Sequence, residues 1–477
     1  MRFQKGGRNW KKMSDAEAKS HKQIEVETIL EALESGSSDR IAAIAEEAHP
    51  GDVEQAFERL VEGDREEVLD SLPVEVLSEW ADYLPASDVE HRLNSLPKVE
   101  QREVLDSLSD DELVDLLQEI EEDDRPQYIE LLPEEKRQVS EDLMRYPEET
   151  AGGRMTMAMA TITEGISVKD ALEELRVVRD EAEILSRIYV VDEDRRILGK
   201  VLLRDLAFST WDTPIRELMD DDQIAIEAMA DQEEAAQMIA RYDLLALPVV
   251  DEEKRLLGVI THDDALEILE EESTEDMEKI SGIGGDRGDH AYLQTGVMAH
   301  FRRRFGWVLV LGFLALASGF VLHGYENVMT AYFVLAIYYP MVVAAGGNTG
   351  AQSATMVIRA MSLGELDSRE FGRVVWKESR VGILLGVFLG LCVAVQVYFF
   401  LPERFAPEGL SMGLVSFVVA VALTLQIFTS TLFGALLPIL ARILKLDPAV
   451  VASPAITTIV DVSGSVIYFT IAKIVFF

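Results

Sequence analysis

Five long apolar stretches near the end of the chain constrain its fold more than any other feature. They cover residues 306–322, 328–360, 379–401, 411–441 and 450–477. Each is long enough for an α-helix to cross the hydrocarbon core of a bilayer, which takes about 17–20 residues. The sequence therefore predicts a membrane domain of five helices, residues 305–477.

Charge divides the chain in the same place. Residues 301–477 hold 9 acidic and 12 basic side chains, whereas residues 1–300 hold 76 and 32. A polyanion of this kind does not bind nucleic acid by neutralising phosphates, but it attracts metal cations and suits high-salt solution. Two interpretations stay open, a surface adapted to salt and a set of cation-sensing sites. We expect both, with salt adaptation accounting for most of the carboxylates.

Basic residues in the connecting segments predict the orientation in the membrane. Alternate loops, at 323–327 and 402–410, contain only Arg404, whereas the other segments are basic. The basic residues there are Arg302, Arg303, Arg304, Arg359, Arg369, Arg373, Lys377, Arg380, Arg442 and Lys445. Because basic loops stay in the cytoplasm, we expect a multi-pass protein of the cell membrane with residues 1–304 inside and the C-terminus outside.

The cysteine content and the N-terminal segment exclude some classes of site and signal. Cys392 is the single cysteine, which excludes a disulfide framework and a zinc site with several cysteine ligands. Residues 1–23 form a basic, polar tail that we expect to be disordered, and they lack the apolar segment of a signal peptide. Met13 is an alternative start.

Residues 24–150 carry a rhythm of twelve residues. Prolines 73, 85, 97 and 133 are separated by multiples of twelve, and an apolar residue stands at each step of the register. These residues are Leu72, Leu84, Leu96, Leu108, Ile120 and Leu132. Since proline is tolerated at a helix start but not inside a helix, the rhythm predicts stacked two-turn helices in an α-superhelix. A plain helical bundle is the alternative.

Residues 151–272 contain a duplicated strand pattern. Ile188–Asp192 and Ile197–Leu202 are followed by a helix that opens with Arg204-Asp205. Leu247–Asp251 and Leu256–Thr261 repeat that order about 59 residues later and lead to Asp263-Asp264. The duplication resembles a tandem pair of CBS domains, at 151–215 and 216–272. In many such pairs the positions of Arg204, Asp205, Thr261 and Asp264 contact the ribose and phosphate of an adenine nucleotide.

Residues 273–304 join the two halves. An acidic helical run, Leu266–Glu278, leads into this segment. A solvated helix face is the simplest interpretation of such a run. Since the segment connects the cytoplasmic part to the membrane domain, we expect it to act as the mechanical link between sensor and pore.

The second apolar stretch has an unusual centre. Pro340 is followed by Gly346-Gly347-Asn348-Thr349-Gly350-Ala351-Gln352. Such residues weaken a helix, and unwound backbone at membrane depth is tolerated only in a cavity or inside protein. We expect free carbonyls here, together with the amides of Asn348 and Gln352, to suit a hydrated cation. Glycines in the third stretch, at 382, 386 and 390, are assigned to helix packing.

Asp461 is the most informative residue of the fifth stretch. It lies about 16 Å along a helix from Val450, near the bilayer centre. A carboxylate there is costly and usually marks an ion pathway. Thr457 and Ser453 precede it by one and two turns, so the three oxygens form a stripe near one face. A structural aspartate paired with a helix end or a polar neighbour is the alternative.

These stretches resemble the signatures of the MgtE family of magnesium transporters and channels. The likeness rests on Pro340, Gly346–Gly350 and Gln352, and on Asp447-Pro448-Ala449, Pro454, Thr457-Thr458 and Asp461. It implies a homodimer whose pore follows the two-fold axis and is lined by spans two and five. A hydrated Mg²⁺ near Asp461 is implied, with Thr457, Ser453, Asn348 and Gly347 beside it. The implied fold is a superhelical N-domain, an α/β CBS pair, a long connecting helix and five transmembrane helices.

The resemblance also implies control by cytosolic Mg²⁺, which closes the pore by holding the CBS and N-domains together. Matching acidic positions are Asp231, Glu233, Asp243, Asp264, Glu275 and Asp276. The physics agrees, because clustered carboxylates repel one another until a cation is bound, so the cation favours the state that gathers them.

Some alternatives remain open. Aromatic side chains can sandwich adenine in this family, but Arg187 and Leu244 stand at the matching positions, which argues against ATP because stacking supplies much of the affinity. No His or Cys lies near Asp461, which argues against softer metals. The rivals to a gated Mg²⁺ uptake protein are a broader Co²⁺, Ni²⁺ or Mn²⁺ carrier and a non-conducting membrane sensor. No catalytic motif predicts an enzyme.

Overall fold

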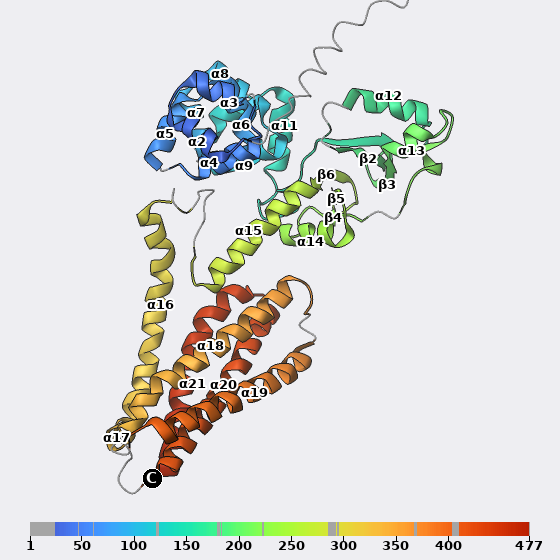
Figure 1. Cartoon of the computed structure of the whole chain (residues 1–477). Helices are drawn as coiled ribbons and strands as arrows, with labels where there is room; N and C mark the ends of the chain where they lie inside the picture. Colours follow the sequence, from blue (N-terminus) through green and yellow to red (C-terminus); the bar gives the residue numbers. More distant parts are fainter. Residues whose placement is uncertain are drawn as a thin grey trace, which may run out of the picture. The chain divides into compact units, whose positions relative to one another are not determined.

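The computed structural model describes residues 24–476 apart from 46, 61, 121–123, 179–181, 183, 222–223, 285–291, 293–294, 367–369 and 403–409. The predicted tail, residues 1–23, lies outside the described residues. The chain divides into two compact units. The first unit is Met1–Glu272 with Arg287–Gly296, and the second is Ser273–Asp286 with Val297–Phe477. Figure 1 colours the chain by sequence, so the first unit runs from blue to green and the second from yellow to red.

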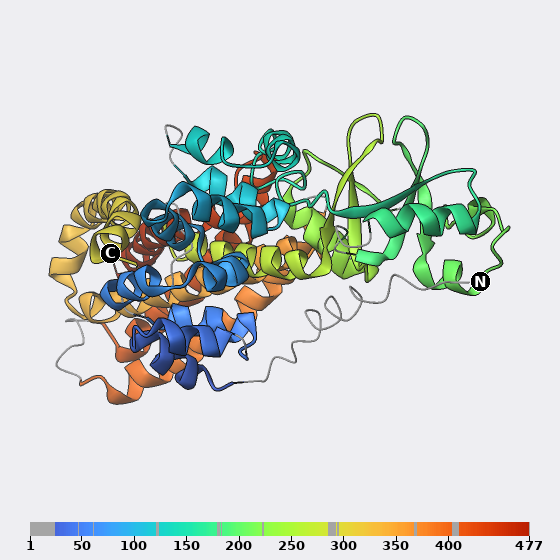
Figure 2. The ribbon, with the colours of Figure 1, turned by 90° about the horizontal axis from the view of Figure 1, so that it is seen from above.

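Short helices build the N-terminal part of the first unit (Figure 2, blue). They are α2 (Val26–Glu34), α3 (Ser38–Ala45), α4 (Pro50–Glu58), α5 (Glu62–Ser71), α6 (Val74–Trp80), α7 (Ala86–Ser95), α8 (Lys98–Ser107), α9 (Asp110–Glu119), α10 (Arg125–Ile129) and α11 (Glu134–Leu143). Prolines 73, 85, 97 and 133 stand immediately before α6, α7, α8 and α11. The predicted rhythm of helix starts is confirmed.

The apolar register of this domain is buried as expected. All six residues at the twelve-residue steps, from Leu72 to Leu132, are at most 8% exposed. Helices pack on their second neighbours in sequence, α5 on α7, α6 on α8, α7 on α9 and α9 on α11. Each two-turn helix therefore buries its apolar side against helices further along, which is the arrangement of a superhelix.

Two small sheets follow, one for each predicted CBS domain. The first contains β1 (Met159–Thr163), β2 (Ile184–Val191) and β3 (Ile197–Leu202), and the second contains β4 (Ile226–Glu227), β5 (Ala246–Val250) and β6 (Leu256–Thr261). In each sheet the first two strands are parallel and the last two antiparallel. The helices are α12 (Val168–Val178), α13 (Leu203–Phe208), α14 (Gln232–Tyr242) and α15 (His262–Ile280). The duplicated pattern therefore folds as a duplicated α/β unit.

The second unit consists of long helices (Figure 1, yellow to red). They are α16 (Val297–Gly324), the short α17 (Glu326–Ala331), α18 (Val334–Ser362), α19 (Phe371–Phe400), α20 (Met412–Ile443) and α21 (Pro448–Phe476). Among the described residues, α16, α19, α20 and the part of α21 from Ile456 onwards are long and apolar enough to cross a membrane. Helix α18 is as long as the others, but its glycines and amides keep it from the same apolar class.

The centre of α18 differs from the prediction. The expected unwinding at Gly346–Gly350 is wrong, because α18 is helical from Val334 to Ser362. Gly346 and Gly350 serve close packing instead. A Cβ on Gly346 would collide with Gln426 of α20, and one on Gly350 would lie 3.2 Å from the carbonyl oxygen of Ser430. The helix tolerates these residues because α20 occupies the space that side chains leave.

Helices α19 and α20 pack in the same manner. A Cβ on Gly386 would lie 2.8 Å from the carbonyl oxygen of Thr424, and one on Gly390 would lie 2.6 Å from the Thr424 hydroxyl. Thr424 Oγ1 donates to the Gly386 carbonyl at 2.9 Å. The assignment of the glycines of the third span to helix packing is confirmed.

Gly434 of α20 tests this packing. A Cβ on Gly434 would collide with the backbone carbonyl of Gly350, and backbone cannot move aside cheaply. We expect Gly434→Ala to destabilise the membrane domain by about 1–3 kcal/mol, measured as a lower midpoint of thermal unfolding in detergent. Gly413→Ala, on the same helix, is the control, because a Cβ on Gly413 would lie 3.9 Å from the nearest atoms. Equal stability of the two variants would contradict the packing.

Candidate ion pathway and its cytoplasmic control sites

Asp461 lies within α21 and is half-buried. Within the described residues no cationic side chain forms an ion pair with it. The interpretation of Asp461 as part of an ion pathway stays a prediction, as does the alternative of a structural aspartate beside a helix end or a polar neighbour.

Neighbouring helices hold the backbone on both sides of this carboxylate. The Gln426 side chain of α20 donates from Nε2 to the carbonyl oxygen of Val460 at 2.9 Å. Ser465 Oγ donates to the carbonyl oxygen of Asp461 at 2.7 Å, and the hydroxyl of Tyr339 on α18 lies 2.9 Å from Ser465 Oγ. Sequence reasoning missed Gln426, although an amide in an apolar span carries the same kind of signal as Asp461.

Other predicted pathway groups lie on uncovered parts of α18 and α21. Thr457 and Asn348 are exposed, and a Cβ on Gly347 would meet no atom within 4 Å. The side chain of Ser453 lies outside the described residues, so its role stays a prediction. Since α18 and α21 pack on each other, these groups belong to one pair of helices.

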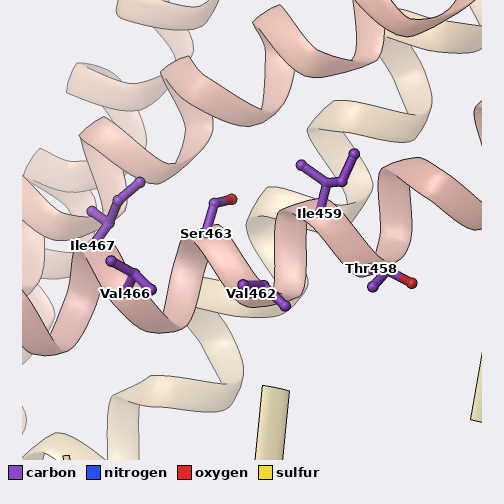
Figure 3. Close-up of a pocket in the computed structure, with 6 residues that line it drawn as sticks. All are labelled: Thr458, Ile459, Val462, Ser463, Val466 and Ile467. Carbon is purple, nitrogen blue, oxygen red and sulfur yellow. The ribbon is translucent and has the colours of Figure 1, made fainter. Parts of the chain in front are cut away.

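A hollow of about 400 Å³ opens on the side of α21. Figure 3 shows its six lining residues, all from this helix. They are Thr458, Ile459, Val462, Ser463, Val466 and Ile467. The lining is apolar except for the hydroxyls of Thr458 and Ser463, so this side of α21 offers no charged ligand to an ion.

The end of α15 is attached to both α18 and α21. Lys279 Nζ lies 2.6 Å from Glu275 Oε1 and 2.9 Å from Asp447 Oδ2, at the start of α21. Ser362 Oγ, at the end of α18, donates to Asp276 Oδ2 at 3.0 Å. Ile280 packs beside Ala354 and Ile456 of the same two helices. Of the predicted regulatory residues, the structure brings Glu275 and Asp276 together here.

One lysine and three carboxyl groups meet at this contact. Burial lowers the pKa of Lys279, but the hydrogen bonds and charges of Glu275 and Asp447 outweigh it and raise the pKa above its ordinary value. Burial raises the pKa of Asp276, opposed by the Ser362 hydrogen bond and reinforced by Asp447. The lysine therefore acts as a fixed cation among three carboxylates.

The other predicted regulatory residues have local partners. Asp231 Oδ1 accepts from the Glu233 amide at 2.8 Å and caps α14, and Glu233 accepts from Gln237. Asp243 ends the same helix at a φ of 51°. Asp264 accepts from the backbone and hydroxyl of Thr261. No three acidic, histidine or cysteine side chains form a metal-sized group in the described part of the chain.

Arg154 is a functional candidate that sequence reasoning missed. Its guanidinium contacts Glu271 of α15 at 2.5 Å, Gln232 of α14 at 2.9 Å and Asp115 of α9 at 3.7 Å. Gln232 in turn donates to Glu272 at 2.6 Å. One arginine therefore ties the N-terminal helices, the second CBS domain and α15 together.

Glu267 lies on α15 near the same cluster. Partial loss of solvent around it, together with the negative charges of Asp264, Glu54 and Glu271, raises its pKa to about 7, although the side chain keeps an exposed face. Glu54 belongs to α4 of the N-terminal helices. Negative charge from two domains therefore converges on this carboxyl.

The predicted nucleotide positions contact each other and the solvent. Arg204 and Asp205 lie in the first turn of α13, with Nε and Oδ1 3.6 Å apart; Arg204 is exposed and Asp205 is partly exposed. Leu244 is 8% exposed and Arg187 lies in β2. The structure places no aromatic ring at either adenine position.

Sequence comparisons agree with this architecture. The family described as "Divalent cation transporter" matches residues 339–471. The "MgtE intracellular N domain" matches residues 48–149, and the CBS domain matches residues 151–209 and 215–271. Fold and matches together define a membrane-embedded divalent cation transporter with an intracellular N domain and a CBS pair.

Similarity to individual relatives shows the family to which the chain belongs. The magnesium transporter MgtE of Thermus thermophilus is 40% identical over 344 residues, which cover 72% of this chain and 74% of the relative. The magnesium transporter MgtE of Bacillus subtilis is 34% identical, with 69% and 70% covered. The chain belongs to the MgtE family, a family of transporters rather than of enzymes.

A solved structure matches the first part of the chain. It is the crystal structure of the cytosolic domain of the Mg²⁺ channel MgtE in complex with ATP. It is 36% identical, has a TM-score of 0.46, and covers 51% of this chain and 99% of that one.

Glu267 predicts a pH dependence of stability. Because its pKa in the folded protein is raised, its contribution is favourable below about pH 4.5 and is lost as the pH rises through about 7. We expect Glu267→Gln to match the wild type near pH 5 and to exceed it by about 1 kcal/mol at pH 8 after solvent screening. Thermal unfolding of the Mg²⁺-free full-length protein measures this. Glu270→Gln, on the same helix, is the control; a pH-independent difference would refute the assignment.

Proposed function

We propose that this chain transports Mg²⁺ into the cell through a pathway formed by α18 and α21, under the control of its cytoplasmic part. The main support is the position of Asp461, a half-buried carboxylate inside an apolar helix with no ion pair among the described residues. Two relatives that bear the name magnesium transporter support the choice of ion.

The chemistry around Asp461 suits a hydrated ion. Mg²⁺ gives up its water reluctantly and is usually bound through one or two carboxylates with several waters retained. One carboxylate with hydroxyl and amide groups nearby, from Thr457 and Asn348, fits this requirement better than a cage of bare ligands. Co²⁺, Ni²⁺ and Mn²⁺ remain the competing cargo.

A homodimer follows from the same groups. The side of α21 with the hollow is uncovered in one subunit, and α16 has no buried residue among those described. A second copy across a two-fold axis supplies a second Asp461 and covers apolar surface that a single subunit leaves open. We propose this arrangement, with the first unit in the cytoplasm and the C-terminus outside.

Control acts through α15. Its end contacts α18 through Asp276 and α21 through Lys279. Cytosolic Mg²⁺ neutralises the carboxylates that gather in the closed state and so shifts the population towards it. The proposed sensing residues are Asp231, Glu233, Asp243, Asp264, Glu275 and Asp276, of which the last two stand at this contact.

ATP is a secondary proposal for the CBS pair. The solved relative was crystallised with ATP, and in the first turn of α13 Arg204 is exposed and Asp205 is partly exposed. Without an aromatic ring at Arg187 or Leu244, a nucleotide here depends on polar contacts to ribose and phosphate, so we expect weak binding.

Asp461→Asn tests the pathway. The amide keeps the size of the carboxyl but removes the charge that offsets the lost hydration of the ion. We expect Mg²⁺ uptake to fall at least a hundredfold, measured as growth and uptake in a host that lacks its own Mg²⁺ importers. Glu326→Gln, at an exposed position at the start of α17, is the control and is expected to keep uptake. Uptake by Asp461→Asn at the wild-type rate would refute the pathway, and uptake of Co²⁺ in place of Mg²⁺ would favour the broader carrier.

Lys279→Gln tests the control. Without the ammonium, Glu275, Asp276 and Asp447 repel one another and the closed contact weakens by about 1 kcal/mol. We expect the internal Mg²⁺ concentration for half-closure to rise about fivefold in bilayer recordings, with unchanged unitary current. Lys445→Gln, in the turn before α21, serves as the control. A variant that closes at the wild-type concentration would remove Lys279 from the gate.

A further inference from the structure

We propose that Gln426 is a positioning residue of the ion pathway, whose buried amide fixes the orientation of α21 and thereby of Asp461. This inference rests on the proposed function, in which Asp461 faces the ion. Gln426 belongs to α20, which that proposal does not place in the pathway.

The contact is direct and shielded. Gln426 is fully buried, and its Nε2 donates to the carbonyl oxygen of Val460, the residue before Asp461, at 2.9 Å. Val460 is fully buried as well. A hydrogen bond shielded from water meets little competition from solvent, so it holds geometry more firmly than an exposed one.

Two helices make room for this amide. A Cβ on Gly464 of α21 would lie 2.7 Å from Gln426 Nε2, and a Cβ on Gly346 of α18 would collide with the same atom. The side chain therefore occupies a slot that exists only because both neighbours are glycine. The slot lies one turn from Asp461 along α21.

Packing alone does not explain a glutamine here. Its Oε1 is buried and has no hydrogen-bond partner among the described residues. Leaving an acceptor unpaired is unfavourable, and an apolar side chain of similar length would fill the slot without that penalty. The hydrogen bond that its N–H group donates to the Val460 carbonyl accounts for the amide.

A second contact restrains the next carbonyl from another side. Ser465 Oγ donates to the Asp461 carbonyl at 2.7 Å, and Tyr339 of α18 lies 2.9 Å from that hydroxyl. Helix α20 thus holds the Val460 carbonyl, and Tyr339 of α18 holds the Ser465 hydroxyl that bonds within α21 to the Asp461 carbonyl. Rotation of α21 about its axis would break the contacts from Gln426 and Tyr339, and ion sites tolerate displacements of only about 0.5 Å.

Gln426→Met removes the hydrogen bond and keeps the volume. We expect the Mg²⁺ concentration for half-saturation of the unitary current to rise about tenfold, as for other groups that orient a metal ligand. Recordings use the purified full-length protein in planar bilayers. The internal Mg²⁺ concentration for half-closure is expected to stay unchanged, because Gln426 does not contact α15. Ser416→Ala, a buried position of α20 that bonds only within its own helix, is the control.

Gln426→Glu separates orientation from packing. Only the protonated acid carries a hydrogen to donate to the Val460 carbonyl. We expect half-saturation near that of the wild type at pH 6 and a shift towards the Gln426→Met value at pH 8. A carboxylate that acts only through its charge would attract Mg²⁺ and lower the half-saturation concentration at pH 8, and a side chain that only fills space would leave it unchanged; either result would overturn the proposal. If Gln426→Met does not assemble, this titration decides alone.

Asp461→Asn in the same recordings separates the two proposals. If it conducts like the wild type, the pathway itself is wrong. If it does not conduct while Gln426→Met keeps the wild-type half-saturation, the pathway stands and the positioning role of Gln426 is refuted.

Discussion

A carboxylate inside an apolar helix is the constraint on which the membrane domain depends. Removing Asp461 from water is costly, and no basic side chain of the described residues repays that cost with an ion pair. In the proposed pathway a hydrated cation repays it without a permanent partner. Glycines on α18, α20 and α21 bring these helices close, and the hydrogen bond from Gln426 to the Val460 carbonyl connects α20 to α21 beside Asp461.

Arg154 and Lys279 each neutralise part of a cluster of carboxylates, as a bound metal cation would. Arg154 lies among Asp115, Glu271 and Gln232, and Lys279 lies between Glu275 and Asp447. Each is a fixed cation among carboxylates that would otherwise repel. Because exposed ion pairs contribute only about 0–1 kcal/mol each, neither holds the closed state alone. In the proposed control, a further cation from the cytosol adds to these contacts and favours the closed state.

Sequence reasoning succeeded where one residue type has one structural meaning. Proline before a helix and leucine in a twelve-residue register predicted the N-terminal helices correctly. Glycine is different, because it permits both unwinding and close packing. The choice at Gly346 depends on Gln426 and Ser430, which lie about 80 residues away in the chain. Asp231 and Asp264 matched a sensing pattern, yet both also cap local structure. Arg154 and Lys279 were missed because a sequence does not reveal which carboxylates a long side chain reaches.

Helix α15 connects the contacts around Arg154 with the contacts around Lys279. Its 19 residues span about 28 Å at 1.5 Å per residue. Glu271 and Glu272 contact Arg154 and Gln232, whereas the last turn contacts Asp447 and Ser362 at the ends of α21 and α18. A few contacts of about 0.5–1 kcal/mol at each end add up to a few kcal/mol, enough to change an open-to-closed ratio by roughly a hundredfold. Since coupling between sites is reciprocal in free energy, the proposed control requires that whatever favours the contact of α15 with α18 and α21 also favours binding of the regulatory cation.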